Sequence, residues 1–267
     1  MASPVPLNFK LFSRSSRRAE PFLIFALART GSTTLRRLLA CHPDVTCVHE
    51  PFNPGRRPAG APVTDGATLR REVQALRRQH GGIKHVWDSA GWPFPTGSPL
   101  NLELLTMPGH RVLFLNRRNV LRRLVSFHVA SQTDAWGMDD RERAAVQRHR
   151  FAPLDLEELG YFLAGERAEI ARHREAMRES GTPFAELWYE DLFDPRRPLA
   201  DKEATLAGIF GFLGLRPALP AARCSRVRGL FAPDDGPMNS AATYRRIPGI
   251  DEVEARFGSE ATGYLFR

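Results

Sequence analysis

Residues 22–39 read FLIFALARTGSTTLRRLL, and this stretch decides the fold class. Its first part, residues 22–28, is a continuous apolar run, which is the pattern of a strand covered on both faces of a sheet. The run breaks at residues 29–31, and the leucines of residues 35–39 then recur at helical spacing. A strand, a short turn and a helix in this order predict the opening of an α/β fold.

The rest of the chain continues this alternation. A loop-rich tail is expected after Leu215, and proline-rich and glycine-rich loops are expected at residues 53–66 and 90–99. We therefore predict a mainly parallel sheet flanked by helices on both faces, with a P-loop-like phosphate-binding turn after the first strand. The expected strands are residues 45–48, 83–87, 112–115 and 184–189, and the expected helices are residues 67–79, 119–131, 156–179 and 202–213.

Length and composition fit one α/β domain over residues 21–267. The chain has 267 residues, of which 42% are hydrophobic and 25% charged, enough to bury a sizeable core. Residues 1–20 are basic and lack the apolar segment of a secretory signal, so we expect a mobile basic tail on a cytoplasmic protein. The longest apolar run, residues 22–28, is far too short to span a bilayer.

The cysteines and histidines do not form a metal-binding pattern. Cys41, Cys47 and Cys224 have no CxxC spacing, and none of the eight histidines belongs to an HExxH motif. We expect no metal site, and we expect Cys41 and Cys47 to be small core residues.

The formal net charge of +8 favours an anionic partner, such as a nucleotide, a nucleic acid or an acidic glycan. Only Lys10, Lys84 and Lys202 are lysines, so the excess is almost entirely arginine. Coding bias is an equally good explanation of that excess, and charge alone does not decide between the two.

The turn at residues 28–34, ARTGSTT, has the composition of an anion site. Backbone N–H groups and the positive end of the helix dipole face an anion at a helix N-terminus, and Gly31 permits a close approach. Hydroxyl groups follow the glycine, and Arg29 adds charge. The plainer alternative is that Ser32 and its neighbours only cap the helix. GxxxxGK[ST] is absent, so the lysine and the Mg²⁺-binding arrangement of an ATP or GTP hydrolase are missing.

A second candidate anion site follows the strand at residues 112–115. Arg118 stands eight residues before Ser126 in the helix NVLRRLVSFHVASQ, which places them about 12 Å apart along the axis. Arg118 would have to lean along the helix for both to hold one phosphate.

Together, the two sites give the sequence a resemblance to the PAPS-dependent sulfotransferases, where PAPS is 3′-phosphoadenosine 5′-phosphosulfate. FLIFALARTGSTTLRRLLACHP resembles the 5′-phosphosulfate loop of that family, and VLFLNRRNVLRRLVSFHVASQTDAW resembles its 3′-phosphate strand and helix. ELWYEDLFDP, IFGFLGL and, more weakly, GGIKHVWDS add to the likeness, which is greatest to the bacterial trehalose-sulfating branch. The resemblance lies in separate segments between residues 22 and 215, and the segment YRRIPGIDEVEARFG near the C-terminus is more weakly similar.

The resemblance implies a donor site in two parts. One part, for the 5′-phosphosulfate, comprises Arg29, Thr30, Gly31, Ser32, Thr33 and Thr34, and the other, for the 3′-phosphate, comprises Arg118 and Ser126. Cytosolic members of the family have a lysine in the first loop, whereas this chain has Arg29 nearby. The group that contacts the leaving phosphate oxygen therefore stays open.

The resemblance also implies a catalytic base at Glu50, in HEPF just after the second expected strand. His49 is the rival, and alternation along a strand would let only one of the two face the site. Lys84 is either a contact to the sulfuryl group or a surface lysine, and Glu190 of WYEDL is expected to fix the fold.

We therefore predict that the protein is a sulfotransferase. It would transfer a sulfuryl group from PAPS to a hydroxyl of a carbohydrate or glycoconjugate acceptor and release 3′,5′-ADP, without a metal. Trp87, Trp92, Phe94 and Trp136 are candidates for stacking on a sugar or on adenine, or for plain core. The alternatives are a Mg-dependent nucleotide kinase with a degenerate loop, and a basic nucleic-acid-binding protein. The arginines are scattered through several helices and no nucleic-acid-binding motif is present, which argues against the nucleic-acid-binding protein.

Overall fold

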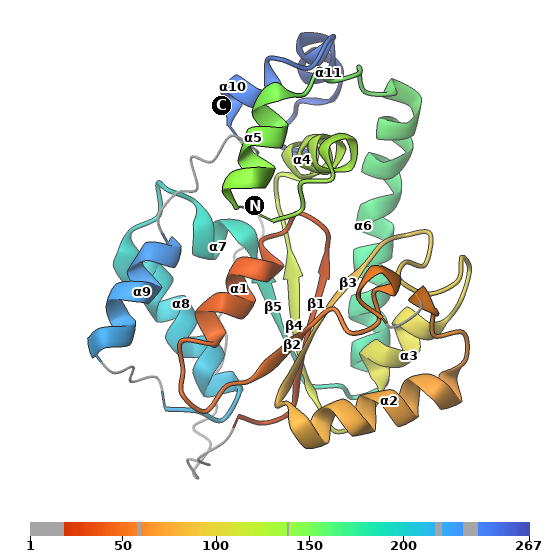
Figure 1. Ribbon diagram of the computed structural model, residues 1–267, viewed down its shortest axis with the longest axis vertical. Helices are drawn as coiled ribbons and strands as arrows, with labels where there is room; N and C mark the ends of the chain where they lie inside the picture. Colours follow the sequence, from red (N-terminus) through yellow and green to blue (C-terminus); the bar gives the residue numbers. More distant parts are fainter. Residues whose placement is uncertain (1–18, 58–59, 138, 217–220, 232–239) are drawn as a thin grey trace.

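The computed structural model describes residues 19–57, 60–137, 139–216, 221–231 and 240–267 (Figure 1). These residues form a five-stranded sheet in the order β2-β3-β1-β4-β5, in which every neighbouring pair is parallel. The predicted fold class is thereby confirmed. The strands are β1 (Phe22–Leu27), β2 (Cys47–His49), β3 (Gly82–Trp87), β4 (Arg111–Asn116) and β5 (Phe184–Trp188).

The apolar run of β1 is continuous because both faces of the sheet are covered (Figure 1). Phe22, Ile24 and Ala26 belong to one buried cluster, together with residues of α1 (Ser32–Leu39), α8 (Leu199–Phe212) and α9 (Ala221–Phe231). Leu23, Phe25 and Leu27 belong to the cluster on the other face, together with residues of α2 (Gly66–Gln79), α3 (Leu100–Thr106) and α6 (Leu156–Glu179).

A third cluster lies beyond the carboxyl ends of the strands, in the upper part of Figure 1. Val125 and Val129 of α4 (Val120–Thr133) pack there with Val146 of α5 (Asp140–Arg148). Tyr244 of α10 (Ala241–Tyr244) and Val253 of α11 (Ile250–Phe257) complete it from the C-terminal part of the chain.

The prediction of a loop-rich tail after Leu215 is wrong, because α9, α10 and α11 lie there. α10 has four residues and α11 eight, too few turns for a helical period to stand out in the sequence. The short helices α3, α5 and α7 (Tyr189–Phe193) also went unpredicted for this reason.

The strand order places a topological switch point beside β1. The chain passes from β1 to β2 and β3 on one side of the sheet, and then to β4 and β5 on the other. In open α/β sheets, ligands bind at the carboxyl ends of the strands at such a point. The predicted turn follows β1 there.

None of the helices in the described part of the chain combines the length and the apolar composition needed to cross a bilayer. Cys41 is buried and Cys47 packs against the same core cluster, as expected. The predicted basic tail, apart from residues 19 and 20, and the side chain of Cys224 lie outside the described residues.

Candidate functional site

The turn between β1 and α1 has a shape that demands glycine. Gly31 lies in the left-handed region with φ 82°, and a Cβ there would come 2.9 Å from Cε2 of Phe193. Arg29 also has a positive φ, 66°. The first N–H groups of a helix have no acceptor within it, so α1 presents open donors directly after Gly31. The local geometry is compatible with the anion site that the sequence predicts at this turn.

Two arginines hold the carbonyl groups of the turn. Arg117 donates to the carbonyl oxygen of Arg29 at 3.1 Å, and Arg123 donates to that of Ala28 at 3.2 Å. Arg123 is paired with Glu166 of α6, and Nε lies 3.0 Å from each carboxylate oxygen. Both partners of this pair are buried, so the positive charge of Arg123 is neutralised where it stands. These arginines act on the turn through its backbone.

Sequence reasoning did not find Arg123 as part of the site. The trace available in the sequence is an arginine inside the otherwise apolar stretch of α4, which requires a buried counter-charge. Glu166, in the middle of α6, supplies it.

The hydroxyl groups of the turn have different surroundings. Thr30 is fully buried, and its hydroxyl donates to the carbonyl oxygen of Leu27 at 2.7 Å, so it braces the end of β1. The Thr33 hydroxyl accepts a hydrogen bond from Nζ of Lys84 at 3.1 Å. Ser32 is buried at the start of α1, and Thr34 follows half-buried in its first turn.

Arg29 connects the turn to α4. Its Nε donates to Oγ of Ser126 at 2.9 Å, and NH1 donates to the carbonyl oxygen of Trp136 at 3.1 Å. Burial lowers the pKa of the Arg29 guanidinium, and the neighbouring Arg117 lowers it further. Ser126 is itself fully buried. The structure thus brings together one residue from each of the two predicted phosphate sites.

Arg118 has other partners. Its guanidinium makes a two-pronged pair with Asp191 of α7, at 3.0 and 3.1 Å, and lies over the ring of Trp188. Asp191 also accepts from Arg197 at 3.0 Å. The Arg118 side chain is half-exposed, at 49%. An anion that takes Arg118 would therefore compete with the Asp191 carboxylate.

Glu190 fixes the backbone at the start of α4. Its two carboxylate oxygens accept from the N–H groups of Arg118 and Asn119, each at 3.0 Å. An anionic side chain at a helix N-terminus is stabilising. The structural role expected for Glu190 is confirmed.

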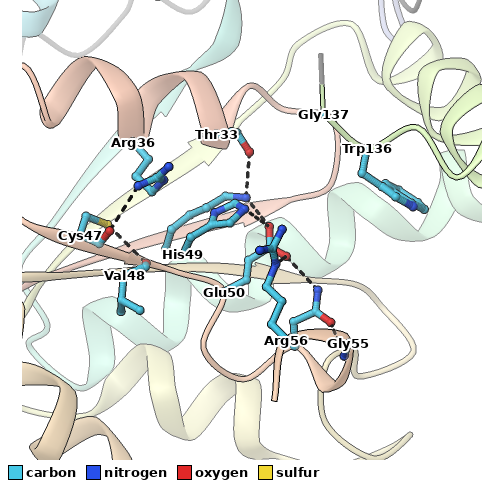
Figure 2. A network of polar contacts seen from close by, with 12 residues as sticks. Thr33, Arg36, Cys47, Val48, His49, Glu50, Gly55, Arg56, Trp136 and Gly137 are labelled. Atoms are coloured by element: carbon cyan, nitrogen blue, oxygen red, sulfur yellow. Dashed lines mark hydrogen bonds and ion pairs between the residues drawn. The ribbon is translucent and has the colours of Figure 1, made fainter. Parts of the chain in front are cut away.

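The strand alternation that would turn His49 and Glu50 to opposite sides does not extend to Glu50. β2 ends at His49, and Glu50 adopts the left-handed φ of 48°, so strand alternation stops between them. Nε2 of His49 lies 3.9 Å from Oε1 of Glu50, and both face the same network (Figure 2). The Glu50 N–H is fixed by the carbonyl oxygen of Lys84 at 2.9 Å.

Lys84 is a buried residue, and the alternative of a surface lysine is wrong. Its side chain is 2% exposed, in the middle of β3, which lies between β2 and β1. Nζ donates both to Thr33 of the turn and to Oε1 of Glu50. A cation in this position joins the predicted donor site to the predicted base.

The pKa of Glu50 is held at about 2. Burial raises it, but the charge and hydrogen bond of Lys84 and the Asn53 amide, at 3.0 Å from Oε2, outweigh burial. Burial and the same lysine lower the pKa of His49 to about 4. Burial also lowers the pKa of Lys84, against the opposing effect of Glu50. At neutral pH the site therefore holds an ionised Glu50 beside an uncharged His49.

Two further arginines approach the base. Nε of Arg56 lies 3.9 Å from Oε2 of Glu50, and its side chain is 51% exposed. Arg36 of α1 contacts the carbonyl oxygen of Cys47 at 3.5 Å, and its buried Nε has no hydrogen-bond partner among the described residues. Figure 2 shows the two arginines on either side of His49 and Glu50.

The candidate stacking residues divide into two groups. Trp87 and Phe94 are buried in the core, whereas Trp92 and Trp136 are exposed at 42% and 45%. Trp136 packs edge-on against the exposed Phe127, with ring centroids 5.6 Å apart. Its indole N–H donates to Asp134 at 2.9 Å, and this bond fixes the orientation of the ring.

The chain is similar to known sulfotransferases in sequence over one segment. A sulfotransferase family model matches residues 21–92. No curated protein matches the chain. Among solved structures, the chain is similar to the one described as the crystal structure of mouse sulfotransferase SULT7A1 complexed with PAP, at 14% identity and a TM-score of 0.44, covering 94% of this chain and 82% of that one.

The family match covers the segment that contains the turn after β1, Glu50 and Lys84. Over residues 21–92 the chain is therefore similar to sulfotransferases, and the enzyme class predicted from its sequence, a sulfotransferase, is confirmed.

Proposed function

We propose that the protein transfers a sulfuryl group from PAPS to a hydroxyl of a carbohydrate acceptor, with Glu50 as the base. One observation carries this proposal. Lys84 bridges the hydroxyl of Thr33, in the anion-binding turn, and the carboxylate of Glu50. A donor site and a base must lie within reach of one another for a transfer in line, and a single side chain spans them here.

The described residues suit such a donor. The N-terminus of α1, the Thr33 hydroxyl and the Lys84 ammonium offer N–H and O–H donors to a 5′-phosphosulfate. Ser126 and Arg118 are the residues proposed for the 3′-phosphate, and Arg29 ties Ser126 to the turn. When bound, PAPS supplies the activated sulfuryl group.

The proposed roles follow from charge. Glu50 accepts the proton of the acceptor hydroxyl while the oxygen of that hydroxyl bonds to sulfur. The sulfur–oxygen bond to the 5′-phosphate breaks, and its electron pair stays on the phosphate oxygen. Lys84 and the α1 N-terminus stabilise that negative charge. His49, uncharged because its pKa is about 4, is a neutral neighbour rather than an anion or cation.

The proposal of a carbohydrate acceptor is based on Trp136. Aromatic faces suit the apolar faces of sugar rings, and Trp136 is exposed and held in one orientation by Asp134. Its backbone is joined to the donor turn through Arg29. This agrees with the resemblance to the bacterial trehalose-sulfating branch, and the proposed acceptor is a glycan or small sugar of that kind.

The test is transfer of ³⁵S from labelled PAPS to a panel of sugars that includes trehalose, in buffer containing EDTA. We expect a labelled sugar and 3′,5′-ADP as products, and loss of label transfer in Glu50→Gln. A parallel assay with γ-labelled ATP and Mg²⁺ tests the kinase alternative. Phosphate transfer with ATP and none from PAPS would overturn the proposal.

A further inference from the structure

Lys84 occupies a position that the proposed function alone does not explain. It is buried, yet it pairs with the very carboxylate that must act as a base. An ionised partner at hydrogen-bond distance makes a carboxylate a poor proton acceptor. In this network Glu50 has a pKa of about 2, far from the value that suits a general base near neutral pH.

The other charged groups around Glu50 do not raise its pKa. Arg56 approaches the second carboxylate oxygen, at 3.9 Å, and Arg36 adds positive charge from α1. His49, from the end of β2, is the remaining titratable neighbour, and its pKa is lowered by burial and by Lys84. Lys84 and, to a smaller extent, His49 lower the pKa of Glu50, and Lys84 is the closest charged group to its carboxylate.

Resting on the proposed function, we propose that Lys84 is a donor-sensing catalytic residue, which moves its hydrogen bond from Glu50 to the phosphosulfate oxygens and so activates the base only in donor-loaded enzyme. Nζ is already at the turn, through its 3.1 Å bond to Thr33. An anion at the α1 N-terminus arrives next to this ammonium and competes with Glu50 for its hydrogen bonds. Little side-chain movement is needed, because one cation already touches both sites.

Two effects then act on Glu50 in the same direction. Loss of the Lys84 hydrogen bond raises the pKa of the carboxylate, and so does the negative charge of the bound donor. The same exchange puts the ammonium where the leaving phosphate oxygen gains charge. The covalent step is the one given for the proposed function. The acceptor proton goes to Glu50, and the acceptor oxygen bonds to sulfur. The bond between sulfur and the 5′-phosphate oxygen breaks, and its electron pair leaves with 3′,5′-ADP.

Carboxyl-carbon NMR of the full chain with ¹³C-labelled glutamate tests this without an acceptor or turnover. The Glu50 resonance is assigned by its absence in Glu50→Gln and followed from pH 7 to pH 4, with and without saturating 3′,5′-ADP. We expect no titration above pH 4 in the free protein, and a pKa higher by about 2–3 units with 3′,5′-ADP, which brings the titration into this range. Glu72, which is paired with Arg57 at 2.7 Å and 2.9 Å, is the matched control and should not respond.

Lys84→Met gives the complementary result. Its free form should show a raised Glu50 pKa that 3′,5′-ADP changes much less than in wild type. If this variant does not fold, the wild-type titration still decides. Binding of 3′,5′-ADP with an unchanged Glu50 titration would overturn the inference and leave the proposed function standing. Failure of 3′,5′-ADP to bind at all would overturn both.

Discussion

Nε of Arg29 donates to Oγ of Ser126 at 2.9 Å, across 97 residues of sequence. Arg29 belongs to the turn after β1, and Ser126 lies on α4 after β4, the neighbouring strand. One residue of each predicted phosphate site is therefore joined to the other, across adjacent strands of the sheet. This contact is one of the observations that support the proposed donor with two phosphate groups.

Arg118→Ala should reduce the preference for a 3′-phosphate. A charge-assisted contact of this kind contributes about 1.5–3 kcal/mol, so the affinity ratio of 3′,5′-ADP over 5′-AMP should fall by about tenfold or more. Calorimetry with both nucleotides measures the ratio. Arg197→Ala is the control, because Arg197 pairs with the same Asp191 at 3.0 Å. If both variants keep the wild-type ratio, Arg118 does not contact the 3′-phosphate.

Glu166→Gln should destabilise the fold strongly. It leaves the buried Arg123 guanidinium without its counter-charge, and breaking such a pair costs about 3–5 kcal/mol. Chemical denaturation measures the loss. The double variant Arg123→Met/Glu166→Met should recover much of that stability but still bind 3′,5′-ADP weakly, because Ala28 loses its donor. Wild-type affinity in the double variant would show that Arg123 does not position the turn.

The sequence predicted the sheet well because β1 carries its own evidence. Six consecutive apolar residues alternate between two buried clusters, and a strand covered on both faces must read this way. The bounds of α6, Leu156–Glu179, also match the prediction. The tail helices α10 and α11 were missed because helices this short are held by packing on the third cluster, not by a pattern of their own.

The site was only partly predictable. Gly31 and the hydroxyl residues after it are consecutive in sequence, so this part of the site can be recognised from the local sequence alone. The position of Lys84 depends on the pairing of β3 with β1 and β2, which composition does not encode. The relation of His49 to Glu50 depends on one positive φ at Glu50, and a non-glycine residue gives no warning of it.

Glu50→Gln should lower kcat by about 10²- to 10⁴-fold, the usual contribution of a general base. The affinity for 3′,5′-ADP should not fall, because the base meets the acceptor and the Glu50 carboxylate competes with the nucleotide for Lys84. The variant leaves Lys84 without its counter-charge, so Lys84→Met/Glu50→Gln serves as a check that the fold persists. His49→Ala is the comparison. Normal turnover in Glu50→Gln with none in His49→Ala would make His49 the base.

Stability should fall as the pH falls from about 6.5 to about 4. Burial lowers the pKa of His85 and of His173 to about 4 each, so the unfolded chain binds protons in this window and the folded chain does not. Each such histidine contributes a slope of up to about 1.4 kcal/mol per pH unit. His173→Phe should reduce the slope, since Phe suits the aromatic contacts with Phe25 and Trp87. An unchanged slope would exclude His173 as its source.

The binding of 3′,5′-ADP in the presence of EDTA tests the central claim most directly. Calorimetry on the wild-type protein should show 3′,5′-ADP binding without metal, about tenfold or more tighter than 5′-AMP, because the 3′-phosphate adds a charge-assisted contact. ATP should bind more weakly than 3′,5′-ADP, with or without Mg²⁺. Equal affinity for 3′,5′-ADP and 5′-AMP, or tight binding of ATP that requires Mg²⁺, would contradict a sulfotransferase that uses PAPS.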